Sequence, residues 1–385
     1  MTLRPKIGWL AILLAWCPFS PVISKESAEA EPQISVRVSA LIDRAMARAE
    51  AVGLSYAVIR DNRILLVGHA GLANTEQAIA VSNDTLFRIA SITKQFTAAA
   101  ILLLAERGRL ELDQPASRYI VELDTDDRQP TIRQLLNHTS GLPDVITGTC
   151  DLAYRIGSKR QANAPELQPL IYQFEPGARW SYSNCGYLLL GELIEVVDGR
   201  SYAKFIQEEF SRPLGLRNTF VEIPHTRSSQ LATGYRLGVG DVDFLVREDL
   251  DPGNFQPAAG IVSSAADMAR WQLSLIRGEI ISRASFKSMI LSATETDDRS
   301  PSYGLGLMVR QSSNGFSVGH TGNVRGSNNV AMWYPRTGYF IVILSNSETF
   351  PSAMLEQQIS ELLEGELDCR ERGNDGLCTA LAETS

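Results

Sequence analysis

The period of the hydrophobic pattern changes along this 385-residue chain and predicts strands near both ends, with helices between them. We expect a first helix over about residues 36–51. Two apolar runs around the turn signal Asp61-Asn62 predict a pair of strands. From Tyr303 onward, short apolar runs separated by turn residues predict further strands and a closing amphipathic helix. The expected strands cover residues 55–60, 64–69, 304–310, 316–320, 329–334 and 339–345, and the closing helix covers residues 353–363.

The middle of the chain, about residues 116–255, has a helical pattern. It contains an apolar run over residues 187–197, ended by Asp198-Gly199, and a second segment over residues 202–210, with loops rich in Pro, Gly and Asp. Short connections between the later strands imply antiparallel pairing. The pattern therefore predicts an α+β fold, in which helices flank one antiparallel sheet and a helical subdomain is inserted in the middle.

A Ser-x-x-Lys pattern, Ser91 and Lys94, stands at the head of residues 96–105, which are apolar nearly all round and predict a buried helix. A helix turns once in about 3.6 residues, so the Lys94 amine would lie beside the Ser91 hydroxyl. An amine that burial keeps partly neutral can accept the hydroxyl proton as the serine attacks a carbonyl. The alternative interpretation makes Ser91 a helix cap and Lys94 a solvated charge.

The same spacing occurs a second time in the chain, at Ser201 and Lys204. This serine follows Asp198-Gly199-Arg200 and precedes an amphipathic segment, so we expect Ser201 to be the N-cap of a surface helix. Spacing alone therefore does not identify a nucleophile. The choice of Ser91 depends on the buried helix that follows it.

Two later stretches, Tyr182-Ser183-Asn184 and His320-Thr321-Gly322, follow the first pattern in a fixed order and together favour a serine hydrolase. This ordered set resembles the serine β-lactamase and penicillin-binding protein superfamily. A Tyr-x-Asn second motif, with histidine in place of lysine in the third, is similar to the class C-related branch. That branch includes serine D-alanyl-D-alanine carboxypeptidases and related esterases and amidases. Residues 135–142, 174–177 and 260–267 also resemble it.

The resemblance implies a β-lactamase/transpeptidase-like architecture, with the catalytic cleft between the sheet and the helical part. Ser91 would form the acyl-enzyme, with Lys94 as its base or proton relay. Tyr182 would pass a proton to the leaving group. Asn184 would hydrogen-bond a substrate amide. Without the resemblance, Tyr182 is interpreted as an aromatic packing residue and Asn184 as a cap of the following helix.

The third motif carries the remaining implied site residues. Thr321 would contact a substrate carboxylate, Gly322 would permit close approach, and the backbone N–H groups of Asn323 and Ser91 would form an oxyanion hole. The β-lactamase consensus has a lysine, a permanent cation, where this chain has His320, which is largely neutral at pH 7 unless its site favours the charged form. This difference argues against assuming antibiotic hydrolysis, but not against catalysis. The alternative makes this segment a glycine-rich strand end.

Composition narrows the function classes. The formal net charge is −8 and no basic stripe is present, so nucleic acid is not an expected partner. The four histidines are scattered, with no metal-ligand spacing, so neither a metal nor another cofactor is expected. His138 matches no catalytic motif, and we expect a structural role for it. The sequence leaves the oligomeric state open.

Residues 1–30 have the pattern of a signal peptide, because basic residues flank an apolar run over residues 7–16 and small residues suitable for cleavage follow. Lipoprotein processing before Cys17 and retention as an anchor are alternatives. Pro18 and Pro21 argue against a continuous spanning helix, so we expect no stable membrane insertion once the leader is removed. The expected location is the periplasm or the exterior of a bacterial cell.

The mature chain would then consist of a catalytic domain over residues 31–365 and a polar tail over residues 366–385. Its even number of cysteines suggests disulfides, and Cys369 with Cys378 is the expected local pair. Cys185 lies next to the second motif, but a catalytic thiol is the weaker hypothesis. The sequence does not fix how the remaining cysteines pair.

The sequence thus predicts an exported serine hydrolase that acylates itself with small amides or esters of the D-alanyl peptide or β-lactam type. A carboxylesterase of the same fold is one alternative, because acyl-enzyme chemistry also serves esters. A penicillin-binding or cell-wall sensor module that acylates without turnover is another.

Overall fold

The computed structural model describes residues 25–48, 51–120, 128–144, 172–221, 223–237, 243–245, 255–296, 301–312 and 315–371. Residues 1–24 of the predicted signal peptide lie outside these ranges. The predicted Cys369–Cys378 pairing also lies outside the described residues. No helix in these ranges is long and apolar enough to cross a membrane.

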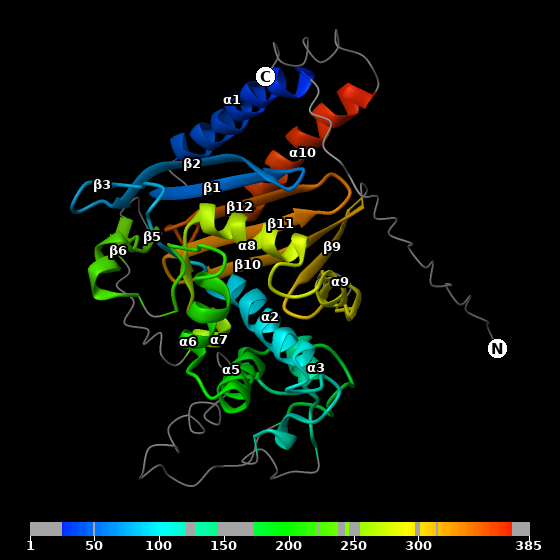
Figure 1. The fold of residues 1–385 in the computed structure, drawn as a ribbon. Coiled ribbons are helices and arrows are strands. Elements are labelled where there is room, and N and C mark those ends of the chain that lie inside the picture. Colours follow the sequence, from blue (N-terminus) through cyan, green and yellow to red (C-terminus); the bar gives the residue numbers. More distant parts are fainter. Residues whose placement is uncertain are drawn as a thin grey trace, which may run out of the picture.

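An antiparallel sheet is the frame of the molecule (Figure 1), and its strand order is β3-β2-β1-β12-β11-β10-β9-β8. The pairing of β1 with β12 joins the N-terminal and C-terminal parts of the chain, with Tyr56 opposite Ile343. The strands are β1 (Gly53–Arg60), β2 (Arg63–Asn74), β3 (Ile79–Ala80), β8 (Ser302–Tyr303), β9 (Met308–Ser312), β10 (Gly315–Val324), β11 (Ser327–Tyr334) and β12 (Tyr339–Ser345). The predicted α+β class and antiparallel sheet are confirmed.

One predicted strand, residues 304–310, is interrupted in the structure. A turn separates β8 from β9, and Gly306 within it has φ of +76°. A Cβ atom at Gly306 would lie 2.8 Å from the Lys94 carbonyl oxygen, so the turn packs directly against the helix that carries Lys94. Only glycine combines this left-handed conformation with so close an approach.

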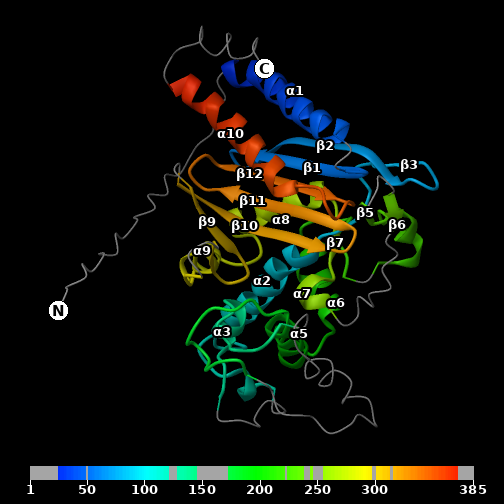
Figure 2. The same ribbon diagram turned by 180° about the vertical axis from the view of Figure 1, so that it is seen from behind.

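Helices cover both faces of the sheet, as the two opposite views show (Figures 1 and 2). On one face lie α1 (Lys25–Ala47) and α10 (Ser352–Glu371); on the other lie α2 (Thr93–Glu106), α8 (Ala265–Arg277) and α9 (Arg283–Leu291). The sequence prediction did not include α9. Both outer helices are longer than expected, since α1 begins inside the predicted leader and α10 continues to Glu371, into the predicted tail.

The helical part lies at the far end of α2 (Figure 1). Its helices are α3 (Ile132–Leu136), α5 (Asn184–Asp198), α6 (Tyr202–Ile206) and α7 (Gln256–Ala259). Short elements complete the described fold: β4 (Phe87–Arg88), β5 (Tyr235–Leu237), β6 (Asp243–Leu245), β7 (Val262–Ser263), the 3₁₀ turns η1 (Ala90–Ile92), η2 (Ala116–Arg118) and η5 (His225–Gln230), and the π-helical η4 (Gln207–Ser211).

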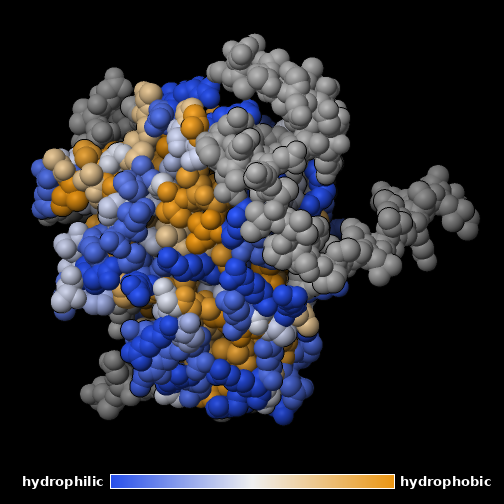
Figure 3. All heavy atoms as spheres, turned by 45° about the horizontal axis from the view of Figure 1, so that its top comes forward, coloured by the Kyte–Doolittle hydropathy of each residue, from blue (hydrophilic) through white to orange (hydrophobic). Residues whose placement is uncertain are grey.

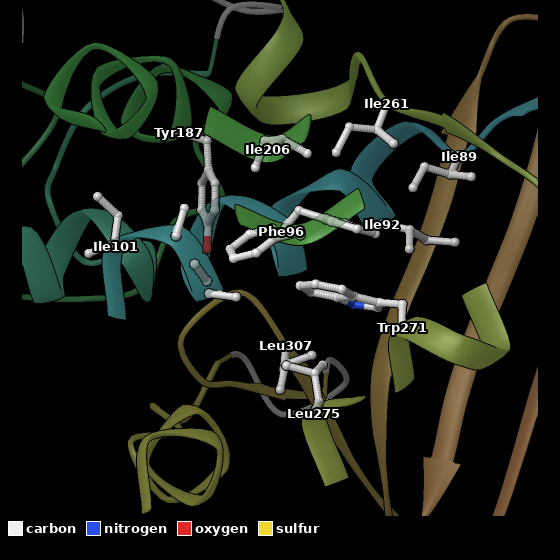
Figure 4. Packing of buried hydrophobic residues seen from close by; sticks show 14 of the residues in the cluster. Ile89, Ile92, Phe96, Ile101, Tyr187, Ile206, Ile261, Trp271, Leu275 and Leu307 are labelled. Carbon is white, nitrogen blue, oxygen red and sulfur yellow. The ribbon is translucent and has the colours of Figure 1, made fainter. Parts of the chain in front are cut away.

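The sheet separates two hydrophobic clusters, and the alternation of side chains along β12 supplies both. Phe340, Val342 and Leu344 face the cluster that contains α2 and α8, whereas Ile341 and Ile343 face the α1 and α10 side. In the first cluster, Phe96 of α2 stacks on Trp271 of α8, with ring centroids 3.9 Å apart. Figure 4 shows Ile92, which follows Ser91 directly, beside this pair. The core therefore fixes the start of α2.

The outer surface on the side turned forward in Figure 3 is largely hydrophilic, with apolar residues gathered in a strip along its middle. Two large apolar side chains of the outer helices are exposed, Val36 on α1 and Met354 on α10. Single exposed apolar side chains such as these two are common on protein surfaces.

Candidate active site

Ser91 lies in the short turn η1, immediately before α2, at the position where the pattern predicted the head of a buried helix. Its neighbours Ala90 and Ile92 are buried, while Ser91 itself is partly exposed. Ala90 has φ of +49°, which is strained for a residue with a Cβ atom. The turn thus places Ser91 at a helix N-terminus, where the helix dipole favours developing negative charge.

Lys94 is fully buried, with 0% of its surface exposed. Its Nζ lies 3.3 Å from Ser91 Oγ, 2.7 Å from Asn184 Oδ1 and 2.9 Å from the Ala258 carbonyl oxygen. All three contacts are neutral oxygens, so none compensates a positive charge. Burial lowers the pKa of Lys94 to about 7, although the charge of Asp144 acts in the opposite direction.

The neutral form of this amine has a defined use. It can donate its two protons to the amide and carbonyl oxygens, which are the nearer contacts, and turn its lone pair toward the Ser91 hydroxyl. That arrangement is what a general base for Ser91 requires. The predicted proximity of Ser91 and Lys94 is present, and the amine is kept partly neutral as the sequence pattern suggested.

Asn184 connects Lys94 to a carboxylate that the sequence did not reveal. Its Oδ1 accepts from Lys94, and its Nδ2 donates to Asp144 Oδ1 at 2.9 Å. The alternative in which Asn184 caps the helix is wrong, because the N-cap of α5 is Ser183, whose side chain accepts from Gly186 N. Asp144 follows the Thr-Ser-Gly-Leu-Pro segment, but no spacing links it to Asn184.

Tyr182 brings its phenol to the nucleophile, where its hydroxyl forms a hydrogen bond with Ser91. Its ring lies beside the amine, with Lys94 Nζ 4.9 Å from the ring centroid. Burial raises the pKa of Tyr182 above its ordinary value, so the phenol keeps its proton at neutral pH. Lys94 of the first motif and Tyr182 of the second therefore meet at the Ser91 hydroxyl, as predicted.

His320 of the third motif is buried in β10 and is held in one tautomer. Its Nδ1 lies 2.5 Å from the Thr321 carbonyl oxygen, which can only accept, so Nδ1 carries the proton. Its Nε2 then accepts from the Tyr303 hydroxyl at 2.8 Å. Burial, helped by the charge of Lys94, lowers the pKa of His320 to about 3, so no cation stands at this position near pH 7.

The strand that carries the third motif runs close to the nucleophile turn. A Cβ atom at Gly322 would lie 2.1 Å from the Ile89 carbonyl oxygen, so only glycine fits there. Among the described residues, the pairing of β10 with β9 extends only as far as Gly319, whereas its pairing with β11 continues to Val324. The segment that includes Thr321 and Asn323 therefore has one free edge, and the roles assigned to these two residues stay predictions.

Asn329 of β11 is a site residue that the sequence did not indicate. It is fully buried, and its Nδ2 donates to the Gly322 and Arg88 carbonyl oxygens, both at 2.9 Å. Its Oδ1 accepts from Ser345 N at 3.1 Å. One amide thus ties the third motif to the strand leading into the Ser91 turn.

Two further predictions concern cysteine and metal. Cys185, next to Asn184, is disulfide-bonded, which agrees with the expectation of disulfides and leaves no free thiol at this position. Within the described residues, no group of three or more His, Cys, Asp or Glu side chains could hold a metal ion.

The β-lactamase family model matches residues 38–364, so the chain belongs to the β-lactamase family, whose members with this fold are serine hydrolases. Penicillin-binding protein 4* of Bacillus subtilis is 30% identical over 294 residues, 72% of this chain and 64% of the relative. Protein flp of Staphylococcus aureus is 25% identical over 80% of this chain and 62% of the relative. The chain thus spans less than two thirds of these curated relatives.

Solved structures agree with this assignment. The octameric penicillin-binding protein homologue from Pyrococcus abyssi superposes with a TM-score of 0.73 at 26% identity, over 86% of this chain and 77% of that one. The D-amino acid amidase from Ochrobactrum anthropi SV3 complexed with L-phenylalanine gives a TM-score of 0.70 at 25% identity, over 86% of this chain and 99% of that one. The predicted superfamily and fold are confirmed.

Proposed function

We propose that this protein is an exported serine hydrolase that forms an acyl-enzyme with small amides whose acyl group is a D-amino acid residue, D-alanyl peptides among them. The observation that carries the proposal is the surroundings of Ser91. A fully buried amine with a pKa of about 7 lies 3.3 Å from its hydroxyl, and a protonated phenol is hydrogen-bonded to the same hydroxyl. A base and an acid are therefore both in place for acyl transfer.

In the proposed reaction, Ser91 Oγ forms a bond to the substrate carbonyl carbon while neutral Lys94 accepts the hydroxyl proton. The resulting oxyanion would be stabilised by the backbone N–H groups of Ser91 and Asn323, and donors of this kind commonly contribute about 2.7–4 kcal/mol each. Tyr182 donates its proton to the leaving nitrogen as the C–N bond breaks, and Lys94 returns a proton to the phenolate.

Deacylation would use the same groups in reverse. A water molecule attacks the ester carbonyl and gives a proton to the Lys94 and Tyr182 pair. Ser91 Oγ then takes that proton as the ester bond breaks, and the product acid leaves. Catalysis in both directions by one pair follows from microscopic reversibility.

The chemistry of the third motif and the relatives support the substrate class. Neutral His320 supplies no permanent cation for the carboxylate that β-lactams carry. The structural neighbours include an enzyme described as a D-amino acid amidase and another described as a D-stereospecific amidohydrolase, from Streptomyces sp.. The Cys185 disulfide and the leader pattern support export, because disulfides persist mainly in oxidising compartments.

The first experiment is intact-protein mass spectrometry with a fluorescent penicillin on the wild type, Ser91→Ala and Ser201→Ala. We expect a covalent adduct on the wild type and on the Ser201→Ala variant, and none on Ser91→Ala. An adduct that survives Ser91→Ala and disappears in Ser201→Ala would overturn the choice of nucleophile.

The second experiment compares turnover of D- and L-amino acid amides, a D-alanyl-D-alanine peptide, nitrocefin and p-nitrophenyl butyrate. The proposal expects hydrolysis of D-amides well above their L-enantiomers. Turnover of the butyrate ester alone would favour a carboxylesterase. A burst without steady turnover on every substrate would favour a penicillin-binding sensor module.

A further inference from the structure

His138 is a buried histidine to which the proposed reaction gives no chemical step. It follows α3, is 1% exposed, and has φ of +62°, a left-handed conformation that strains a residue with a side chain. We propose that His138 is a positioning residue, which holds Tyr182 against Ser91 through its backbone carbonyl and its neutral imidazole. The inference rests on the proposed function, in which Tyr182 moves the proton.

The geometry is a two-point clamp around Tyr182. The backbone N–H of Ser181 donates to the His138 carbonyl oxygen at 2.9 Å, and the backbone N–H of Ser183 donates to His138 Nδ1 at 3.1 Å. These two amides flank Tyr182 on either side. In this left-handed backbone conformation, His138 supplies both hydrogen-bond acceptors, one with its backbone carbonyl oxygen and one with its side chain.

The ring of His138 completes the contact. Its centroid lies 4.3 Å from that of Tyr182, with the two planes tilted by 38°. It also lies 4.5 Å from the ring of Tyr303, whose hydroxyl donates to His320 Nε2. His138 therefore touches the aromatic side chains that connect the second motif to the third.

The clamp requires the neutral imidazole. Nδ1 accepts the Ser183 N–H, so it cannot carry a proton. The ring proton therefore lies on Nε2, which is buried and has no hydrogen-bond partner among the described residues. Burial, together with the charges of Lys94 and His320, lowers the pKa of His138 well below its ordinary value. The titratable groups that face the ring are Lys94, Tyr182, Tyr187, Tyr303 and His320.

Two substitutions separate the parts of the clamp. His138→Asn keeps an acceptor at the δ position and tolerates the left-handed backbone, but loses the ring. His138→Phe keeps a ring and loses the acceptor. Phe350→Leu is the control for lost stability, because Phe350 is equally buried but packs in the cluster on the opposite face of the sheet.

The activity test is the rate of Ser91 labelling by the fluorescent penicillin, together with kcat and KM for the best amide. Misplacement of a catalytic group by about 1 Å costs about 10²-fold. We expect a loss of about that size in kcat for His138→Phe, a smaller loss for His138→Asn, and none for Phe350→Leu. In a Tyr182→Phe background, His138→Phe should add little. A full multiplicative loss in that background would overturn the positioning role.

A second measurement does not depend on activity. With tyrosine labelled by ¹³C at Cζ, the Tyr182 resonance is identified by its disappearance in Tyr182→Phe. We expect it to shift in His138→Phe and to stay in place in Phe350→Leu. An unchanged resonance in His138→Phe would contradict the positioning role. A shifted resonance in a protein that is never labelled at Ser91 would support that role while the proposed function fails.

Discussion

Ser91 with Lys94 and Ser201 with Lys204 share one spacing, and each pair stands at the beginning of a helix. Ser201 and Lys204 are exposed, and the Ser201 side chain accepts from the backbone N–H of Lys204 as the N-cap of α6. At the other pair, the amine is buried and lies 3.3 Å from the hydroxyl.

The difference shows that surroundings, and not spacing, give a serine and a lysine their chemistry. The exposed amine keeps its hydration. The amine of Lys94 has exchanged water for three neutral oxygens, and this loss of solvation lowers its pKa to about 7. The cap of α2, by contrast, is Ile92 without a side-chain bond, so Ser91 is not used to stabilise its helix.

The largest expected effect comes from changing the base. Lys94→Arg keeps a cation but removes a group that can be neutral at pH 7, because arginine stays protonated in proteins. We expect the acylation rate to fall by about 10²–10⁴-fold, the usual contribution of a general base. Lys204→Arg should leave the rate within about twofold, since surface substitutions have small effects. Stopped-flow labelling of both variants measures the two rates, and equal losses would contradict the comparison.

The next effect is a pH dependence. Below its pKa of about 7, Lys94 is protonated and cannot accept the Ser91 proton. The acylation rate should therefore rise about tenfold per pH unit up to about pH 7 and level off above it. His320, with a pKa of about 3, should add no inflection in this range. A pH–rate profile of kcat/KM tests both statements, and a flat profile between pH 5 and 7 would argue against Lys94 as the base.

The third effect is on stability. The pKa of Lys94 is lower in the folded protein than in the unfolded chain, so between about pH 7 and 10.5 the unfolded chain binds more protons and stability rises with pH. At pH 7 nearly the full free-energy cost of burying the charged Lys94 amine is present. We expect Lys94→Met to raise the free energy of unfolding at pH 7 by about 1–3 kcal/mol. The cost of leaving two oxygens without the amine reduces this gain. At pH 9.5 the stabilisation by Lys94→Met should be smaller than at pH 7.

Urea denaturation at the two pH values measures this change. Lys204→Met is the matched control and should alter the free energy of unfolding by less than about 0.5 kcal/mol. A Lys94→Met variant that is less stable than the wild type at both pH values would contradict the account of its burial.

The smallest expected change in stability distinguishes the two serines. Ser201→Ala removes a helix cap and should cost about 1 kcal/mol of stability with no loss of acylation. Ser91→Ala should abolish acylation and cost little stability, because its hydroxyl caps no helix. Thermal unfolding of both variants by circular dichroism provides the comparison.

Local features of the site could be predicted from the sequence. Ser91 and Lys94 are one helical turn apart, and Tyr182, Asn184 and His320 follow from the motifs and their order. The buried helix also distinguished the two Ser-x-x-Lys pairs.

The rest of the site depends on contacts between distant segments. Ala258 meets Lys94 across 164 positions of sequence, and Asn329 meets Arg88 across 241. Asp144 and Tyr303 reach the site only because loops and strands cross there. No period or spacing encodes such crossings. The helix α9 was missed for a different reason, since it is short and follows α8 closely.

The pairing of β1 with β12 has a consequence for the order in which the protein is made. Leu54 lies opposite Ser345, so this ladder cannot form until residue 345 has left the ribosome. Up to that point the nascent polypeptide can hold Ser91, Lys94 and His320 without β12, the strand that joins β1 to β11. Pairings between such distant segments fold slowly. We therefore expect chains released early, before the last strand is synthesised, to contain every motif and yet to be recognised by chaperones or proteases as unfinished.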